Sequence, residues 1–115
     1  MANIRRGEID AVIEGRTRTL VLTLGALAEL EAAFGAADLM ALAERFERGR
    51  IGARDAAHIL CAGLRGAGED VSLAEVERMR VDGGAAGFVR IVAALLAATF
   101  GTGEAAGPPP PPQDA

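Results

Sequence analysis

Two short alternating segments that run straight into a helical pattern constrain the fold of this chain more than any other feature. Residues 8–13 and residues 16–22 each alternate between two faces, as β-strands do. Glu14-Gly15 separates them and fits a tight hairpin turn, because glycine accepts a positive φ angle at little cost. A hairpin alone is only marginally stable, so one of its faces must pack on helices.

Helical periodicity and capping residues fill the sequence that follows the hairpin. Thr23 and Asp38 are good N-cap residues, and Ser72 with Glu75 forms a capping box. Gly35 is placed to end the first helix. We expect helices from Thr23 to Gly35, Asp38 to Gly49, Arg54 to Gly66, Ser72 to Met79 and Ala85 to Phe100. The predicted fold class is α+β, with an N-terminal β-hairpin packed on a mainly α domain of four or five helices.

The domain organisation follows from length and from a change in composition near the C-terminus. The length suits one domain, which we place at residues 1–100. From Gly101 the helical periodicity stops, and residues 108–112 are consecutive prolines. Proline cannot continue a helix and favours the extended polyproline II conformation. We therefore expect residues 101–115 to form a disordered, Pro-rich tail.

The last predicted helix carries more apolar residues than a single stripe requires. Its second half is apolar on nearly every side, so it is either the central helix of the core or partly covered by a partner. We expect this helix to contribute to a surface for a partner or for self-association. The candidate partner-binding residues are Phe88, Ile91, Val92, Leu95 and Leu96.

Charge and composition argue against nucleic acids and membranes as partners. The net charge is -4, and all 12 basic residues are arginines scattered among acidic ones. Such a chain lacks the basic stripe that supplies most of the affinity for phosphate backbones. The longest apolar run, residues 91–100, is about half of the roughly 20 residues that a membrane span needs.

The cysteine content and the N-terminus favour a cytoplasmic protein. Cys61 is the only cysteine, so no disulfide can form within the chain. Glu8 and Asp10 interrupt the segment that would be the apolar core of a signal peptide, and we expect none.

The chain offers little equipment for catalysis or metal binding. His58 and Cys61 lie three residues apart on a predicted helix, but structural zinc sites need four ligands and no second histidine or cysteine exists. Nothing in the pattern orients a base or holds an oxyanion beside Cys61. The carboxylates are spread over predicted helix surfaces rather than gathered in a cleft. We predict no catalytic residue, no cofactor and no metal site, and hence a protein that is not an enzyme.

Several segments together resemble a known family. They are GEIDAVIEGR at residues 7–16, LTLGALAELE at residues 22–31, LMALAERF at residues 39–46 and AGLRGAG at residues 62–68. The chain resembles, over about residues 5–100, the small proteins of the gene transfer agent tail cluster of alphaproteobacteria. These are related to short proteins of tailed prophages, and the family is described both as a tail tube component and as a tail assembly chaperone.

The resemblance implies a role in building a phage-like tail. A tail assembly chaperone coats the helical tape measure protein and recruits tail tube subunits, so these are the implied partners. One short hairpin suits such an adaptor better than a tube wall of extended β-sheet. Two alternatives stay open: a minor structural component of the tail, and a small helical DNA-binding or antitoxin-like regulator.

Overall fold

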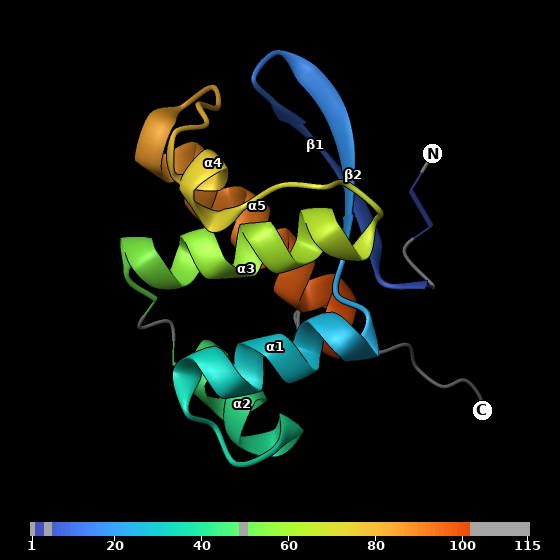
Figure 1. Cartoon of the computed structure of the whole chain (residues 1–115), viewed down its shortest axis with the longest axis vertical. Coiled ribbons are helices and arrows are strands. Elements are labelled where there is room, and N and C mark those ends of the chain that lie inside the picture. Colours follow the sequence, from blue (N-terminus) through green and yellow to red (C-terminus); the bar gives the residue numbers. More distant parts are fainter. Residues whose placement is uncertain (1, 4–5, 49–50, 102–115) are drawn as a thin grey trace, which may run out of the picture.

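The structure is a computed structural model that describes residues 2–3, 6–48 and 51–101. In chain order its elements are β1 (Glu8–Ile13), β2 (Arg16–Val21), α1 (Leu24–Phe34), α2 (Leu39–Glu47), α3 (Ala53–Gly66), α4 (Leu73–Glu77) and α5 (Gly84–Phe100) (Figure 1). The predicted α+β fold class is confirmed, and each described helix lies where the sequence predicts it. Gly49, expected to end the second helix, and the tail from residue 102 onward lie outside the described residues.

The hairpin has the register and turn that its sequence requires. β1 and β2 are antiparallel, with Ile13 opposite Arg16 across a two-residue loop. Glu14 and Gly15 both adopt positive φ angles, 58° and 75°. This pair of angles is typical of the type I′ turn that favours tight hairpins. Ile13 and Leu20 point from the inner face into the core, with 1% and 0% of their surfaces exposed.

Polar contacts fasten the hairpin to the two loops that flank α4. At the tip, the Glu14 N–H donates to the Arg80 carbonyl oxygen at 2.9 Å. In return, the Arg80 N–H donates to the Glu14 carboxylate at 2.7 Å. Further along β2, the guanidinium of Arg18 pairs with the carboxylate of Glu69 at 3.0 Å. The hairpin is therefore held by hydrogen bonds as well as by its apolar face.

The predicted helix caps are confirmed. The Thr23 hydroxyl accepts a hydrogen bond from the Ala26 N–H at 3.1 Å, and the Asp38 carboxylate accepts one from the Ala41 N–H at 2.9 Å. Ser72 and Glu75 bond each other's backbone N–H groups at 3.1 Å and 2.8 Å. These side chains satisfy donors that the first turn of a helix leaves without partners.

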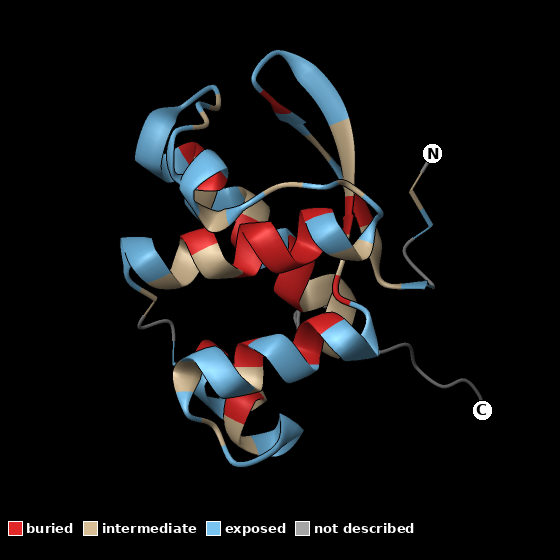
Figure 2. Cartoon of the chain, viewed as in Figure 1, coloured by how far each residue is buried: buried red, intermediate tan, exposed pale blue. Residues whose placement is uncertain are grey.

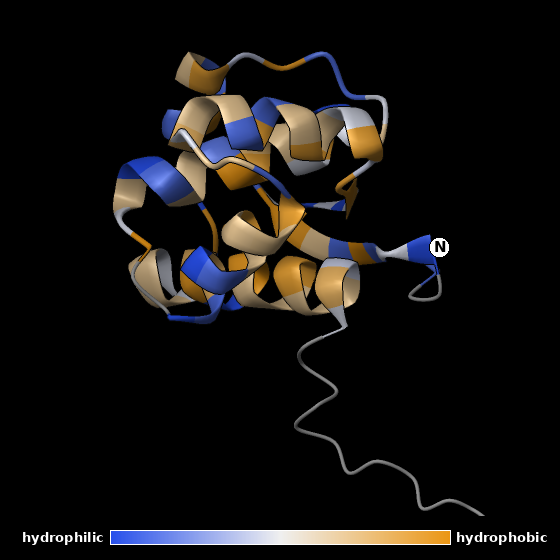
Figure 3. Cartoon of the chain, turned by 90° about the horizontal axis from the view of Figure 1, so that it is seen from below, coloured by the Kyte–Doolittle hydropathy of each residue, from blue (hydrophilic) through white to orange (hydrophobic). Residues whose placement is uncertain are grey.

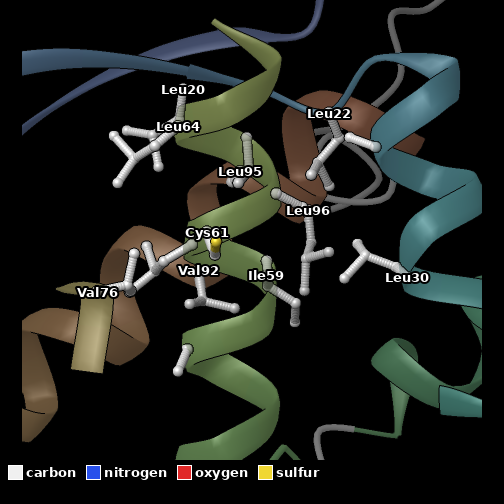
Figure 4. Close-up of a cluster of buried hydrophobic side chains, with 14 of the residues drawn as sticks. Leu20, Leu22, Leu30, Ile59, Cys61, Leu64, Val76, Val92, Leu95 and Leu96 are labelled. Atoms are coloured by element: carbon white, nitrogen blue, oxygen red, sulfur yellow. The ribbon is translucent and has the colours of Figure 1, made fainter. Parts of the chain in front are cut away.

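The central helix of the core is α3. The sequence had left open that α5 is the central helix. α1 packs on one side of α3, the hairpin packs near the C-terminal end of α3, and α5 crosses behind α3 in Figure 1. Figure 2 shows the most continuous buried stretch in α3. Its buried residues are Ala57, Ile59, Leu60, Cys61, Ala62, Gly63 and Leu64. Leu20, Leu64 and Leu95, from three different elements, meet in this core (Figure 4).

Two glycines let the last turns of α3 approach the hairpin and α5 closely. A Cβ atom at Gly63 would lie 2.7 Å from the Leu95 side chain and 3.2 Å from Leu20. A Cβ atom at Gly66 would collide with the carbonyl oxygen of Val21. A side chain at either position would therefore push the elements apart.

Two leucines at the starts of helices are exposed. Leu24 is 75% exposed and Leu39 is 38% exposed. Each is the first residue of its helix. None of the described helices is both long enough and apolar enough to cross a membrane.

Candidate partner-binding groove along the last helix

An apolar groove runs along α5. It consists of two adjoining hollows with volumes of about 470 Å³ and 440 Å³, which share Ile51 and Val89 in their walls. The first hollow lies between α2 and α5 and has Phe46 and Phe100 in its lining. The second lies between α5, the start of α3 and α4, with Val76 in its lining. We call the two hollows together the α5 groove.

One face of α5 forms the floor of the groove. Val89, Val92, Leu96 and Phe100 line the first hollow at spacings of three or four residues, the spacing of one helix face. Val89 is 64% exposed, whereas Val92 and Leu96 are buried against the core. Figure 3 shows this helix, which leads into the grey trace, as largely apolar. Val89 therefore adds an exposed apolar side chain to the floor at the point where the two hollows adjoin.

Aromatic side chains hold α2 over the C-terminal end of α5. The Phe46 ring lies edge-on to Phe34 with centroids 5.8 Å apart, and 6.2 Å from the ring of Phe100. The Arg45 guanidinium lies 5.1 Å from the centroid of Phe34 and forms a 3.6 Å ion pair with Asp55 of α3. Phe46 and Phe100 line the first hollow, and the contacts with Phe34, Arg45 and Asp55 fix α2 in place beside it.

The rim of the groove carries charges of both signs. Glu47 of α2 lines the first hollow, and Arg54 of α3 and Glu77 of α4 line the second. All three residues are exposed. An apolar floor inside a polar rim is the usual anatomy of a protein interface.

The structure separates the five residues that the sequence proposed as partner contacts. Phe88 is half-buried in the second hollow, and Val92 and Leu96 line the first one while being mostly covered. Ile91 lies on a different face of α5, against β1. Leu95 is fully buried in the core. Partner contact at these positions stays a prediction, and α5 presents Phe88, Val92 and Leu96 to the groove.

Sequence reasoning missed the groove residues that come from outside that set. Val89 is the exposed large apolar side chain of α5, and it lies one turn before Ala93 on the same face of the helix. The spacing of four residues between Val89 and Ala93 was the signal in the sequence that could have placed Val89 on this face of α5. Ile51 and Phe46 line the groove from the segment before α3 and from α2. Their contribution depends on how α2 packs against α5, which no local pattern encodes.

The two residues considered for metal or thiol chemistry lie on α3. The ring of His58 contacts Phe34 edge-on, with centroids 6.1 Å apart. Burial raises the pKa of the Cys61 thiol above its ordinary 9.0, although the nearby Arg65 guanidinium acts in the opposite direction. Within residues 2–3, 6–48 and 51–101, no three His, Cys, Asp or Glu side chains are grouped in a way that could hold a metal ion.

Comparison with protein families finds a match over most of the chain. The sequence model of the family described as phage tail tube protein, GTA-gp10, matches residues 6–102. The match spans the hairpin and every described helix, including all the α5 residues that line the groove. Neither the curated proteins nor the solved structures compared with the chain match it.

Proposed function

Because the chain belongs to the GTA-gp10 family of phage tail tube proteins, we propose that it is a non-enzymatic assembly chaperone for the tail of a gene transfer agent or prophage. In this proposal it works in the bacterial cytoplasm while the particle is built. It binds the tape measure protein and passes it to tail tube subunits. The observation that carries the proposal is the α5 groove, an apolar and partly exposed surface on a small acidic domain.

The groove has the character needed to receive an amphipathic helix. Its floor is apolar, its rim is charged, and Val89 stands exposed where the two hollows meet. Helix-in-groove recognition places apolar anchors of one helix at spacings of three and four residues into such a surface. A long helical tape measure would offer many such segments. Self-association through the same surface is the competing use of the groove.

The small share of β-structure supports a chaperone over a subunit of the tube wall. Across the described residues, the strands are β1 and β2, each of 6 residues. A tube wall built from extended sheet needs long strands that pair between subunits. The alternative is a minor structural component of the tail. Such a component remains in the finished particle, whereas a chaperone leaves it.

The interface is tested with a pair of valine substitutions. Val89→Asp places a charge in the groove, and Val12→Asp places the same charge at a valine of the hairpin that is 51% exposed. We expect Val89→Asp to weaken binding to the tape measure protein of the same gene cluster at least about tenfold. Val12→Asp should leave the affinity within about twofold. Circular dichroism checks that both variants stay folded, and equal effects of the two substitutions would contradict the proposed interface.

The chaperone role is tested in purified particles. Quantitative mass spectrometry should find the protein depleted from mature tails relative to the tube subunit. One copy per tube subunit, or a fixed number per tail, would overturn the chaperone proposal in favour of a structural component.

A further inference from the structure

Two walls of the α5 groove come from different helices and are joined by one carboxylate. Asp55 lies in the first turn of α3, and its Oδ2 atom accepts a hydrogen bond from the Gly52 N–H at 3.3 Å. The same oxygen lies 3.6 Å from a guanidinium nitrogen of Arg45 on α2. Gly52 lines the second hollow, and α2 forms a wall of the first one. We call the contact between Arg45 and Asp55 the Arg45–Asp55 clamp.

Few apolar contacts attach α2 to the rest of the domain. It buries only Leu42 and Phe46, and its backbone packs mainly on α1. Toward α5, the ring of Phe46 lies 6.2 Å from that of Phe100. A helix that loses few apolar contacts on opening does so at a low cost in free energy. The position of α2 over the first hollow therefore depends on polar contacts as well.

Arg45 makes two such contacts on the side of α2 that faces α1 and α3. Its guanidinium lies 5.1 Å from the centroid of the Phe34 ring, and it pairs with Asp55. The side chains of Arg45 and Asp55 are 45% and 21% exposed. A partly exposed ion pair and a cation–π contact together favour the closed position of α2 by about threefold or more. Neither Arg45 nor Asp55 belongs to the lining of the two hollows, so they act on the groove through α2.

We propose that Arg45 and Asp55 are positioning residues of the α5 groove: the clamp holds α2 at a fixed distance from the start of α3 and so sets the width of the first hollow. Without the clamp, α2 moves away from Phe100 more often, and the hollow no longer presents one shape to a partner helix. The consequence for partner binding rests on the proposed function. The clamp itself is a property of the free chain.

The test compares two arginines at the C-terminal end of α2 in the full chain. Arg45→Met removes the clamp. Arg48→Met removes an exposed arginine that forms no ion pair with any residue in the described ranges. Methionine is close to arginine in helix propensity, and both substitutions remove a positive charge from the same helix end. The measured quantity is the protection of the α2 amides against hydrogen exchange.

A clamp predicts unequal losses of protection. Arg45→Met should lower the protection of the α2 amides, relative to those of α3, at least about threefold. Arg48→Met should leave it within about 1.5-fold of the native value. Equal losses in the two variants would overturn the proposal, because the shared loss of charge at the helix end would then explain both.

A second substitution tests the other half of the clamp. Asp55→Asn keeps an oxygen that can accept from the Gly52 N–H and removes the charge that pairs with Arg45. It should also lower the protection of α2. The double variant should lose no more protection than Arg45→Met alone, because the two residues act through one contact. Losses that multiply in the double variant would contradict the clamp.

Salt distinguishes the ion pair from simple packing of the Arg45 side chain. Salt screens partly exposed charges, so the difference in α2 protection between the native chain and Arg45→Met should shrink as NaCl is raised from about 0.02 M to about 1 M. A difference that stays constant would show that packing alone positions α2, and it would overturn the role of the pair.

Partner affinity separates this inference from the proposed function. If both hold, Arg45→Met should bind the tape measure protein several-fold more weakly than Arg48→Met, because a less ordered groove has to be ordered on binding. Unchanged α2 protection in Arg45→Met, with normal partner binding by the native chain, overturns only the inference. Lost protection in Arg45→Met, with no partner binding by the native chain, overturns only the chaperone.

Discussion

Glu14 occupies a backbone position that usually takes glycine, asparagine or aspartate. Its φ angle of 58° carries a steric cost for a residue with a long side chain. The side chain compensates by accepting a hydrogen bond from the N–H of Arg80, while the Glu14 N–H donates to the Arg80 carbonyl. A glutamate in a tight turn is therefore explained by a partner far away in the sequence rather than by the turn itself.

Truncating this side chain should loosen the hairpin tip. Glu14→Ala keeps the strained backbone and loses the acceptor, so we expect the free energy of unfolding to fall by about 1 kcal/mol. Glu14→Gln keeps an acceptor oxygen and should lose less than half of that. Urea denaturation followed by circular dichroism measures both values. Equal losses would mean that the negative charge, and not the acceptor, is what matters.

The free energy of unfolding should fall in alkaline solution, because the buried Cys61 thiol loses its proton there. Burial raises the pKa of its thiol above 9.0, so the folded protein holds this proton more tightly than the unfolded chain does. The stabilisation is complete below pH 9 and is lost as the pH rises toward the folded-state pKa. The sequence has no Lys and no Tyr, so little else but the α-amino group titrates between about pH 8 and pH 11.

The Cys61→Ala variant isolates this contribution. Its free energy of unfolding should stay nearly level where that of the native chain declines. A decline of equal steepness in both proteins would show that the thiol is not responsible. The packing cost of the substitution shifts the whole curve and does not change its slope.

At the scale of elements, the junction between α3 and β2 depends on the absence of a side chain. Gly66→Ala would press a methyl group into the carbonyl oxygen of Val21, and backbone cannot move aside as a flexible side chain can. We expect a loss of roughly 2–3 kcal/mol in the free energy of unfolding. The matched control is Gly25→Ala in the first turn of α1, where the nearest atom lies 3.9 Å away.

The control should change stability in the opposite direction. Alanine has the higher helix propensity, so Gly25→Ala should stabilise the protein by about 0.5–1 kcal/mol. Thermal melting of the two variants gives the comparison. Destabilisation by Gly66→Ala no larger than a few tenths of a kcal/mol would contradict the close approach.

The hairpin and the helix caps could be predicted from the sequence because they are local. Thr23, Asp38 and Ser72 each bond a backbone group within three residues, so a short window contains both partners. The order of packing could not be predicted in this way. An apolar stripe on α5 says that the helix buries one face, but it does not say that α3 is the helix at the centre.

The candidate site was partly predictable for the same reason. Excess apolar residues on α5 pointed to the helix that lines the groove, and three of the five proposed residues line it, while partner contact there stays a prediction. Val89 was missed, and Leu95 turned out to be fully buried. Both differences come from the direction in which α5 faces its neighbours, a property of tertiary packing rather than of periodicity.

For the whole molecule, stability should be greatest in α3 and least in α2. α3 is surrounded by α1, α4, α5 and the hairpin, whereas α2 buries only Leu42 and Phe46. Local opening requires less free energy where fewer apolar contacts are lost. Hydrogen exchange should therefore protect α3 amides at least about tenfold longer than α2 amides. Uniform protection across the two helices would contradict this gradient.

The reciprocal hydrogen bonds between Glu14 and Arg80 also set the order in which a new chain can assemble. The ribosome must add 66 residues after Glu14 before Arg80 exists. At bacterial rates of synthesis this takes roughly 3 to 13 s. α5, which packs on β1, comes later still. The hairpin is therefore made first, and its packing surface is complete only after α5, the last helix, has been synthesised.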